Sequence, residues 1–222
     1  MSEAGFSREL RTAADALWQA QHEHPFVTGI GDGSLDPDRF RHFIRQDYLY
    51  LVDYGRVFAL AAGRAPRLDI ARRLVELAHE TFETEMALHR ELAAGWGVGV
   101  DELERERPTP TTLAYTGFLL RTAALDDFAV VASALLPCMW GYSEVGQRLA
   151  SASSPDGRYA GWIASYAAPE FAALAVWCRG LVDELAAGLS DPGRAAMQKA
   201  FVEASRLELA FWDASWRLER PT

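Results

Sequence analysis

Cysteine and strand-forming residues are scarce in this sequence. Its only two cysteines, Cys138 and Cys178, lie 40 residues apart without a Cys-x-x-Cys pair. This argues against a disulfide framework or a cysteine zinc site and favours a reducing compartment. Strand-favouring Val and Ile number 12 and 4, against 37 Ala and 26 Leu. Because alanine and leucine are strong helix formers, the composition predicts an all-α protein.

Positive charge is also in short supply. Lys and Arg together number 22 against 31 Asp and Glu, so the formal net charge is −9. Proteins that bind nucleic acids need a basic surface to displace counterions from phosphates. The charge therefore argues against a nucleic-acid partner and against attachment to an anionic membrane.

No segment has the pattern of a signal peptide or a membrane span. Residues Met1 to Gly5 lack a basic region followed by an apolar one. The longest apolar stretch, Phe128 to Met139, contains Ser133 and Pro137 and is too short to cross a bilayer. We therefore expect a soluble, cytoplasmic protein.

Capping residues, prolines and glycines divide the chain into seven or eight predicted helices. These run from about Ser7 to His24, Asp36 to Ala62, Leu68 to Ala94, Thr112 to Ala124, Asp127 to Ala150, from Pro155, from Pro169, and from Asp191 to Glu219. Gly29 to Ser34 is predicted to be a loop, because three glycines in five residues disfavour a helix. The short connections predict a single-domain helical bundle over residues 1–222.

Asp47 shares the apolar face of its predicted helix, because it follows Phe43 and precedes Tyr50 and Tyr54 at spacings of three and four. A buried carboxylate is unfavourable unless it is hydrogen-bonded. Asp47 therefore either ties two helices by accepting a hydrogen bond from a tyrosine hydroxyl or belongs to a functional site.

Two further helices place reactive groups among apolar residues. Pro137 kinks a predicted helix and frees a backbone carbonyl, and Cys138 and Tyr142 follow it four residues apart. Cys138 is either a small buried hydrophobe or a reactive thiol, whereas Cys178 has the pattern of a core residue. Glu208, followed by Trp212 one turn later, is either an edge residue or a desolvated acid with a raised pKa, as a general acid requires.

The histidines do not fit a metal centre. A di-iron helical bundle uses a Glu-x-x-His pair twice, and only Glu76 and His79 form one here. We therefore predict no metal site. His22 and His24 remain candidates for haem ligation, although histidines at a helix end more often satisfy backbone groups or face solvent.

Four motifs together resemble the TenA family, that is, thiaminase II or aminopyrimidine aminohydrolase, and they cover nearly the whole chain in order. The motifs are His24-Pro25-Phe26-Val27-x-Gly29-Ile30-Gly31-Asp32-Gly33-x-Leu35, Gln46-Asp47-Tyr48-x-Tyr50, Glu85-Met86-x-x-His89 and Leu135-Leu136-Pro137-Cys138-x-Trp140-x-Tyr142. Cys138 places the chain with the cysteine-bearing branch of the family.

The resemblance implies a haem-oxygenase-like all-α fold, a homotetramer and no cofactor. It implies a hydrolase of thiamin salvage that converts 4-amino-5-aminomethyl-2-methylpyrimidine to the hydroxymethylpyrimidine and cleaves thiamin more slowly. Cys138 matches the family's nucleophile, Glu208 its acid/base and Asp47 the carboxylate on the amidine edge of the pyrimidine. The matching pocket tyrosines are Tyr50, Tyr115, Tyr142 and Tyr166.

Two other functions are compatible with the same scaffold. One is a non-catalytic ligand-binding or regulatory protein, although the net charge argues against direct contact with DNA. The other is a haem- or quinone-cofactor enzyme. Ammonia release from an aminopyrimidine distinguishes the hydrolase from both.

Overall fold

The computed structural model describes residues 5–152 and 157–222, and these residues are almost entirely helical. The chain divides into two compact units, each built from separate parts of the sequence. The first unit consists of Met1–Asp36 and Ala129–Asp213, and the second of Pro37–Phe128 and Ala214–Thr222. The predicted all-α class is confirmed.

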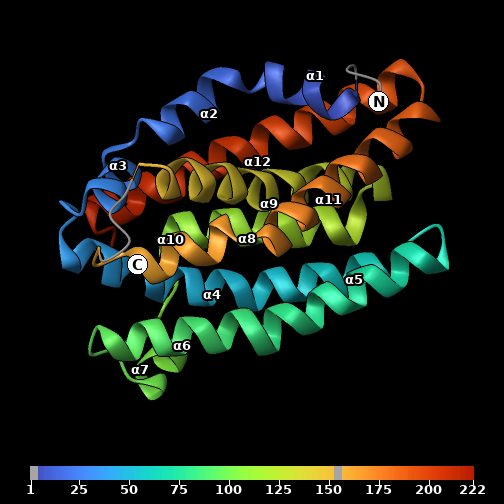
Figure 1. The fold of residues 1–222 in the computed structure, drawn as a ribbon. Coiled ribbons are helices and arrows are strands. Elements are labelled where there is room, and N and C mark those ends of the chain that lie inside the picture. Colours follow the sequence, from blue (N-terminus) through green and yellow to red (C-terminus); the bar gives the residue numbers. More distant parts are fainter. Residues whose placement is uncertain (1–4, 153–156) are drawn as a thin grey trace. The chain divides into compact units, whose positions relative to one another are not determined.

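The first unit combines the N-terminal helices with most of the helices from the second half of the chain (Figure 1). They are α1 (Phe6–Ala13), α2 (Asp15–His22), α3 (Pro25–Asp32), α9 (Phe128–Ala150), α10 (Ala160–Ala167), α11 (Pro169–Ala187) and α12 (Asp191–Arg217). The first residue of α9 and the last residues of α12 belong to the second unit. The core is aromatic: the indole of Trp18 stacks on Phe201 with ring centroids 5.9 Å apart, and its Nε1 donates to Ser205 Oγ at 3.0 Å. α2 is thereby fixed against α12.

The second unit is built around one long helix. Its elements are α4 (Pro37–Ala62), α5 (Leu68–Glu80), the π-helical turn η1 (Thr81–Glu85), α6 (Met86–Gly95), α7 (Val100–Arg105) and α8 (Pro110–Leu125). α4 packs against both α5 and α8 (Figure 1). The side chain of Gln46 fixes the start of α8, because its Oε1 accepts from the Thr109 N–H at 2.9 Å and from Thr112 Oγ1 at 2.8 Å.

The structure corrects the predicted loop over Gly29 to Ser34. Residues 25 to 32 form α3, which His24 caps at its start and Gly33 ends with a φ of 78°. A Cβ at Gly29 would lie 3.1 Å from the backbone nitrogen of Leu35, so glycine allows the close approach of that segment. The buried side chains of Phe26, Val27 and Ile30 outweigh the low helix propensity of glycine.

Other helix boundaries also differ from prediction. The first predicted helix is broken at Ala14, and Ser7 lies inside α1, where its N–H and Oγ donate to Asp183. The helix predicted over Leu68 to Ala94 is interrupted by η1. Pro155 lies outside the described residues, and α10 begins at Ala160. Among the described residues there are twelve α-helices and one π-helical turn, rather than seven or eight helices.

α9 is longer than the apolar stretch recognised in the sequence. It runs for 23 residues with Pro137 inside it, and its length and composition would allow it to cross a membrane. However, 83% of its most apolar 18-residue window is buried. A helix that is apolar on all sides and buried in this way packs inside the protein core.

Candidate active-site residues

Asp47 forms a buried hydrogen-bonded pair in the second unit. It lies on α4 with 3% of its surface exposed, and His89 on α6 is 1% exposed. His89 Nε2 lies 2.6 Å from Asp47 Oδ2. The expected tie between helices therefore exists, but its donor group is an imidazole rather than a tyrosine hydroxyl.

Two of the predicted pocket tyrosines lie together in the same unit. Tyr50 follows Asp47 by one turn of α4, and Tyr115 lies on α8. Both are buried, and their ring centroids are 4.9 Å apart. Tyr54 stacks on Tyr50 at 5.2 Å. Tyrosine rings offer apolar faces with polar tips, a combination suited to a small aromatic amine.

Cys138 and Glu208 lie in the first unit, on α9 and α12, and both are buried. Each precedes a large aromatic residue by four positions, and these two residues, Tyr142 and Trp212, are in ring contact at 5.1 Å. The helices run in the same direction, because Ser133 Oγ, earlier on α9, donates to the backbone oxygen of Met197, earlier on α12. Cys138 and Glu208 therefore each lie one turn before this ring contact on their own helix.

Tyr166 joins this aromatic group from α10. Its ring lies 4.9 Å from Tyr142 and 4.8 Å from Trp162. α9 approaches α10 closely at Gly146, where a Cβ would lie 2.5 Å from the carbonyl carbon of Tyr166. The missing side chain at Gly146 therefore allows Tyr166 to reach Tyr142.

A family model described as the TENA/THI-4/PQQC family matches residues 11–218. The chain belongs to this family. Aminopyrimidine aminohydrolase from Halalkalibacterium halodurans is 41% identical over 213 residues, which cover 95% of each chain. The resemblance to the TenA family is thereby confirmed.

Solved structures support the fold of this TenA-family chain. A TenA homologue protein from P. horikoshii OT3 superposes with a TM-score of 0.89 at 27% identity, covering 96% of this chain and 99% of that one. A domain of unknown function with a heme oxygenase-like fold from Shewanella denitrificans has a TM-score of 0.76 at 13% identity, covering 98% and 94%. The haem-oxygenase-like all-α fold is therefore confirmed.

The sequence of this TenA-family chain contains His89 in the motif Glu85-Met86-x-x-His89 but does not connect it with Asp47. The available signal was its spacing: His89 follows Met86 by three residues and precedes Ala93 by four, and all three are buried on α6. Trp162 contacts both Tyr142 and Trp212. The sequence does not indicate it as a neighbour of the site, because α10 has no clear polar or apolar face.

The two histidines considered for haem ligation have structural partners. His24 Nδ1 accepts a hydrogen bond from the backbone N–H of Phe26 at 3.1 Å and so caps α3. His22 Nε2 lies 3.7 Å from the carboxylate of Glu144. Within residues 5–152 and 157–222, no group of three or more His, Cys, Asp or Glu side chains is placed to hold a metal ion.

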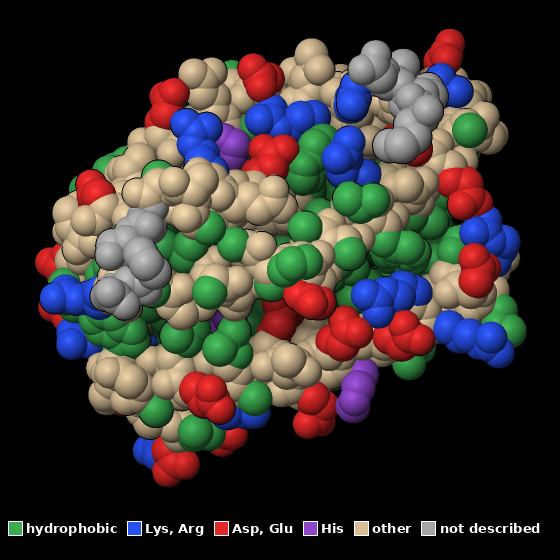
Figure 2. Space-filling model, viewed as in Figure 1, with side chains coloured by type: hydrophobic (Ala, Val, Ile, Leu, Met, Phe, Trp, Pro, Cys, Tyr) green, Lys and Arg blue, Asp and Glu red, His purple; other side chains and the backbone are tan. Residues whose placement is uncertain are grey.

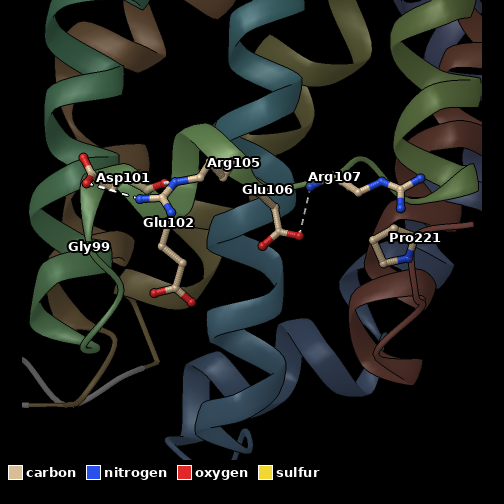
Figure 3. A pocket seen from close by; sticks show the side chains of 7 residues that line it. All are labelled: Gly99, Asp101, Glu102, Arg105, Glu106, Arg107 and Pro221. Atoms are coloured by element: carbon tan, nitrogen blue, oxygen red, sulfur yellow. Dashed lines mark hydrogen bonds and ion pairs between the residues drawn. The ribbon is translucent and has the colours of Figure 1, made fainter.

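A surface pocket of about 550 Å³ opens in the second unit beside α7. It is lined by Gly99, Asp101, Glu102, Arg105, Glu106, Arg107 and Pro221 (Figure 3). Figure 3 shows Arg105 directed at Asp101, and the two are 3.2 Å apart, while Arg45 pairs with Glu102 and Glu106. The predicted site residues are not among the seven, so this pocket is a solvated, charge-paired surface feature. Acidic and basic side chains are likewise interspersed on the face drawn in Figure 2.

Glu85, the last residue of η1, is the basis of a prediction about pH. Burial raises its pKa to about 7, and the nearby charge of Asp47 adds to this effect, whereas His89 and a hydrogen bond from Thr81 oppose it. A carboxyl with a raised pKa favours folding while protonated, and this stability is lost as pH rises through about 7.

We therefore expect Glu85→Gln to be more stable than the parent at about pH 8 by on the order of 1 kcal/mol, or about 2–4 °C in Tm, with little difference at about pH 5. Thermal unfolding followed by circular dichroism at both pH values measures this. Glu83→Gln, at an exposed position of the same turn, is the control. A Tm difference that does not change with pH contradicts the assigned burial of Glu85.

Proposed function

We propose that this protein is an aminopyrimidine aminohydrolase of thiamin salvage. Its substrate is 4-amino-5-aminomethyl-2-methylpyrimidine, its products are ammonia and the hydroxymethylpyrimidine, and it cleaves thiamin more slowly. The observation that carries the proposal is the 41% identity over 95% of each chain with an aminopyrimidine aminohydrolase. The ring contact between Tyr142 and Trp212, one turn after Cys138 on α9 and one turn after Glu208 on α12, supports it.

In the proposed mechanism the Cys138 thiolate forms a bond to a pyrimidine ring carbon and breaks the aromaticity of the ring. Electron density from the ring then expels the amine from the exocyclic carbon, leaving an exocyclic methylene group. Water adds to this methylene carbon, the electrons return to the ring, and the carbon–sulfur bond breaks. Covalent catalysis of this kind replaces one difficult displacement by several easier steps.

Glu208 carries the protons in this scheme. Its protonated carboxyl donates to the leaving amine, and the resulting carboxylate takes a proton from the attacking water. A free thiol with a pKa of about 8.5 is only partly ionised at neutral pH, so Cys138 also needs a proton acceptor or hydrogen-bond donor. Glu208 and Tyr142 are the proposed partners.

Asp47 is the proposed ring-binding group. Its carboxylate accepts hydrogen bonds from the amidine edge of the pyrimidine and favours the protonated ring as electrons flow into it. The proposed pocket tyrosines, Tyr50, Tyr115, Tyr142 and Tyr166, provide flat apolar surfaces for the ring. The proposal needs no organic cofactor or metal, because thiolate, carboxyls and water supply every step.

The proposal extends to residues 1–222 acting as one TenA-like domain in a cytoplasmic homotetramer with no nucleic-acid or membrane partner. Sedimentation equilibrium of the purified protein measures the mass of the assembly. A monomeric or dimeric mass at micromolar concentration contradicts the tetramer and leaves the proposed reaction unaffected.

A turnover assay tests the reaction. The protein is incubated with the aminomethylpyrimidine, with thiamin and with a thiamin-unrelated amine, and ammonia and the hydroxymethyl product are measured. We expect stoichiometric ammonia and alcohol from the first substrate. Tight binding without ammonia release would instead support the ligand-binding alternative.

Asp47→Asn provides a test of the ring-binding role. The side-chain amide of Asn presents an N–H donor to an amidine edge that itself presents N–H donors, so these groups cannot form a hydrogen bond. The amide also lacks the negative charge that attracts a cationic ring. We expect affinity for the hydroxymethylpyrimidine product to fall roughly 10- to 100-fold in calorimetry, the value of a hydrogen bond to a charged group. Asp53→Asn is the matched control, because Asp53 lies on the same helix in an ion pair with Arg56. Undiminished affinity in Asp47→Asn contradicts the role.

A further inference from the structure

The buried pair of Asp47 and His89 is an unusual way to join two helices. The groups come from α4 and α6, are almost fully buried, and meet at 2.6 Å. Removing two ionisable groups from water is unfavourable, and apolar side chains of similar volume often join helices equally well or better. This makes the pair a candidate for a functional role that packing alone does not supply.

Hydrogen-bond chemistry sets the protonation of this pair. His89 Nδ1 lies 3.0 Å from the backbone oxygen of Glu85, and because a carbonyl oxygen only accepts, Nδ1 carries a hydrogen. The contact between Nε2 and Oδ2 requires a second hydrogen. Imidazole is a stronger base than carboxylate, so this hydrogen belongs to Nε2, and the pair is an imidazolium beside a carboxylate.

The surrounding charges support this state. Burial alone would lower the pKa of His89, but the hydrogen bond and charge of Asp47 raise it, with further contributions from the backbone oxygen and carboxyl of Glu85. The charge of Glu80, at the end of α5, helps to raise the pKa of Glu85. α7 also packs on α6. Its carboxylates, Asp101 and Glu102, form ion pairs with arginines rather than with His89.

We propose that His89 is a positioning residue for substrate: its Nε2–H holds Oδ2 of Asp47 and keeps the carboxylate ionised, so that Oδ1 accepts hydrogen bonds from the cationic amidine edge of an aminopyrimidine. This inference rests on the proposed function. It adds a residue that does not touch the substrate and acts only through Asp47.

Two substitutions separate charge from packing. His89→Gln retains an N–H donor but cannot carry positive charge, and His89→Leu removes the donor. We expect His89→Leu to lower kcat/KM roughly 10- to 100-fold, mainly through KM, as for a lost hydrogen bond to a charged group. His89→Gln removes the positive charge beside the Asp47 carboxylate, so we expect the acid limb of the kcat/KM profile to move to higher pH. A packing role would lower stability without moving that limb.

The control for these measurements is His79→Gln. His79 is exposed near the end of α5, and its substitution leaves the pH profile unchanged. If the parent enzyme is active and the His89→Gln profile superimposes on it, the inference is overturned and the proposed function stands. If the parent releases no ammonia from any aminopyrimidine, the proposed function fails and the positioning role fails with it.

A spectroscopic measurement on residues 1–222 tests the inference without an activity assay, and it does not require His89→Leu to fold. Nitrogen-15 labelling of histidine reports the protonation of all five imidazoles, and the His89 signal is assigned by its loss in His89→Gln. We expect His89 to remain doubly protonated to a higher pH than free histidine, and Asp47→Asn to abolish that difference. Titration of His89 at the pH of free histidine, or below it, in the parent protein overturns the inference.

Discussion

Replacing Cys138 by serine is expected to abolish ammonia release from the aminomethylpyrimidine while leaving the helical circular dichroism unchanged. Serine has nearly the same volume as cysteine, so the packing of α9 is retained, but its hydroxyl is not ionised at neutral pH. We expect kcat to fall by at least roughly 10³-fold, as when other covalent enzymes lose their nucleophile. Steady-state ammonia release measures the loss.

Cys178→Ser is the matched control for this experiment. Cys178 lies on α11 of the same unit and is 8% exposed, against 9% for Cys138, so both substitutions introduce a hydroxyl into a similarly buried position. We expect Cys178→Ser to retain the parent kcat with a small loss of stability. Full activity in Cys138→Ser removes the nucleophile from the mechanism, and equal loss in both variants points to packing rather than chemistry.

Glu208→Gln is expected to lower kcat far more than it lowers substrate affinity. The amide has the shape of the protonated acid but can neither give up a proton to the leaving amine nor take one from water. General acid–base catalysis typically contributes about 10²–10⁴-fold, and we expect a decrease in kcat within this range. Calorimetric affinity for the product and kcat, measured on the same preparation, separate binding from chemistry.

The control for Glu208 lies on the same helix. Glu203 is partly exposed and pairs with Arg206, so Glu203→Gln changes the same functional group outside the buried face. We expect parent-like kcat in this variant. An effect of Glu208→Gln on KM alone argues against acid catalysis and assigns Glu208 to substrate binding instead.

Helix boundaries could be predicted where the signal is local. Asp36-Pro37 begins α4 and Pro169 begins α11, because an N-cap residue and a first-turn proline act on their own neighbours. Local propensity alone predicts a loop at Gly29 and Gly31, because glycine disfavours a helix. Burial of Phe26, Val27 and Ile30 decides that segment, and burial depends on parts of the chain far away in sequence.

The same distinction applies to the candidate site. Helical spacing predicts Asp47 on a buried face, which the structure confirms, but leaves Glu208 either at an edge or buried; the structure buries it. It could not identify the partner of Asp47, because His89 lies 42 residues further along the chain on another helix. Nor could it foresee that the lack of a side chain at Gly146 brings Tyr166 close to Tyr142.

By itself, the sequence determined the helical class and the family and supplied the candidate site residues, since these follow from composition, motifs and the periodicity of single helices. Tertiary structure alone decided which groups meet. Asp47 meets His89, and the helices that carry Cys138 and Glu208 run in the same direction, with Tyr142 in contact with Trp212. The physical reason is that hydrogen bonds and ring contacts require approach within a few ångströms, and for residues on different helices the packing of the whole chain sets that distance.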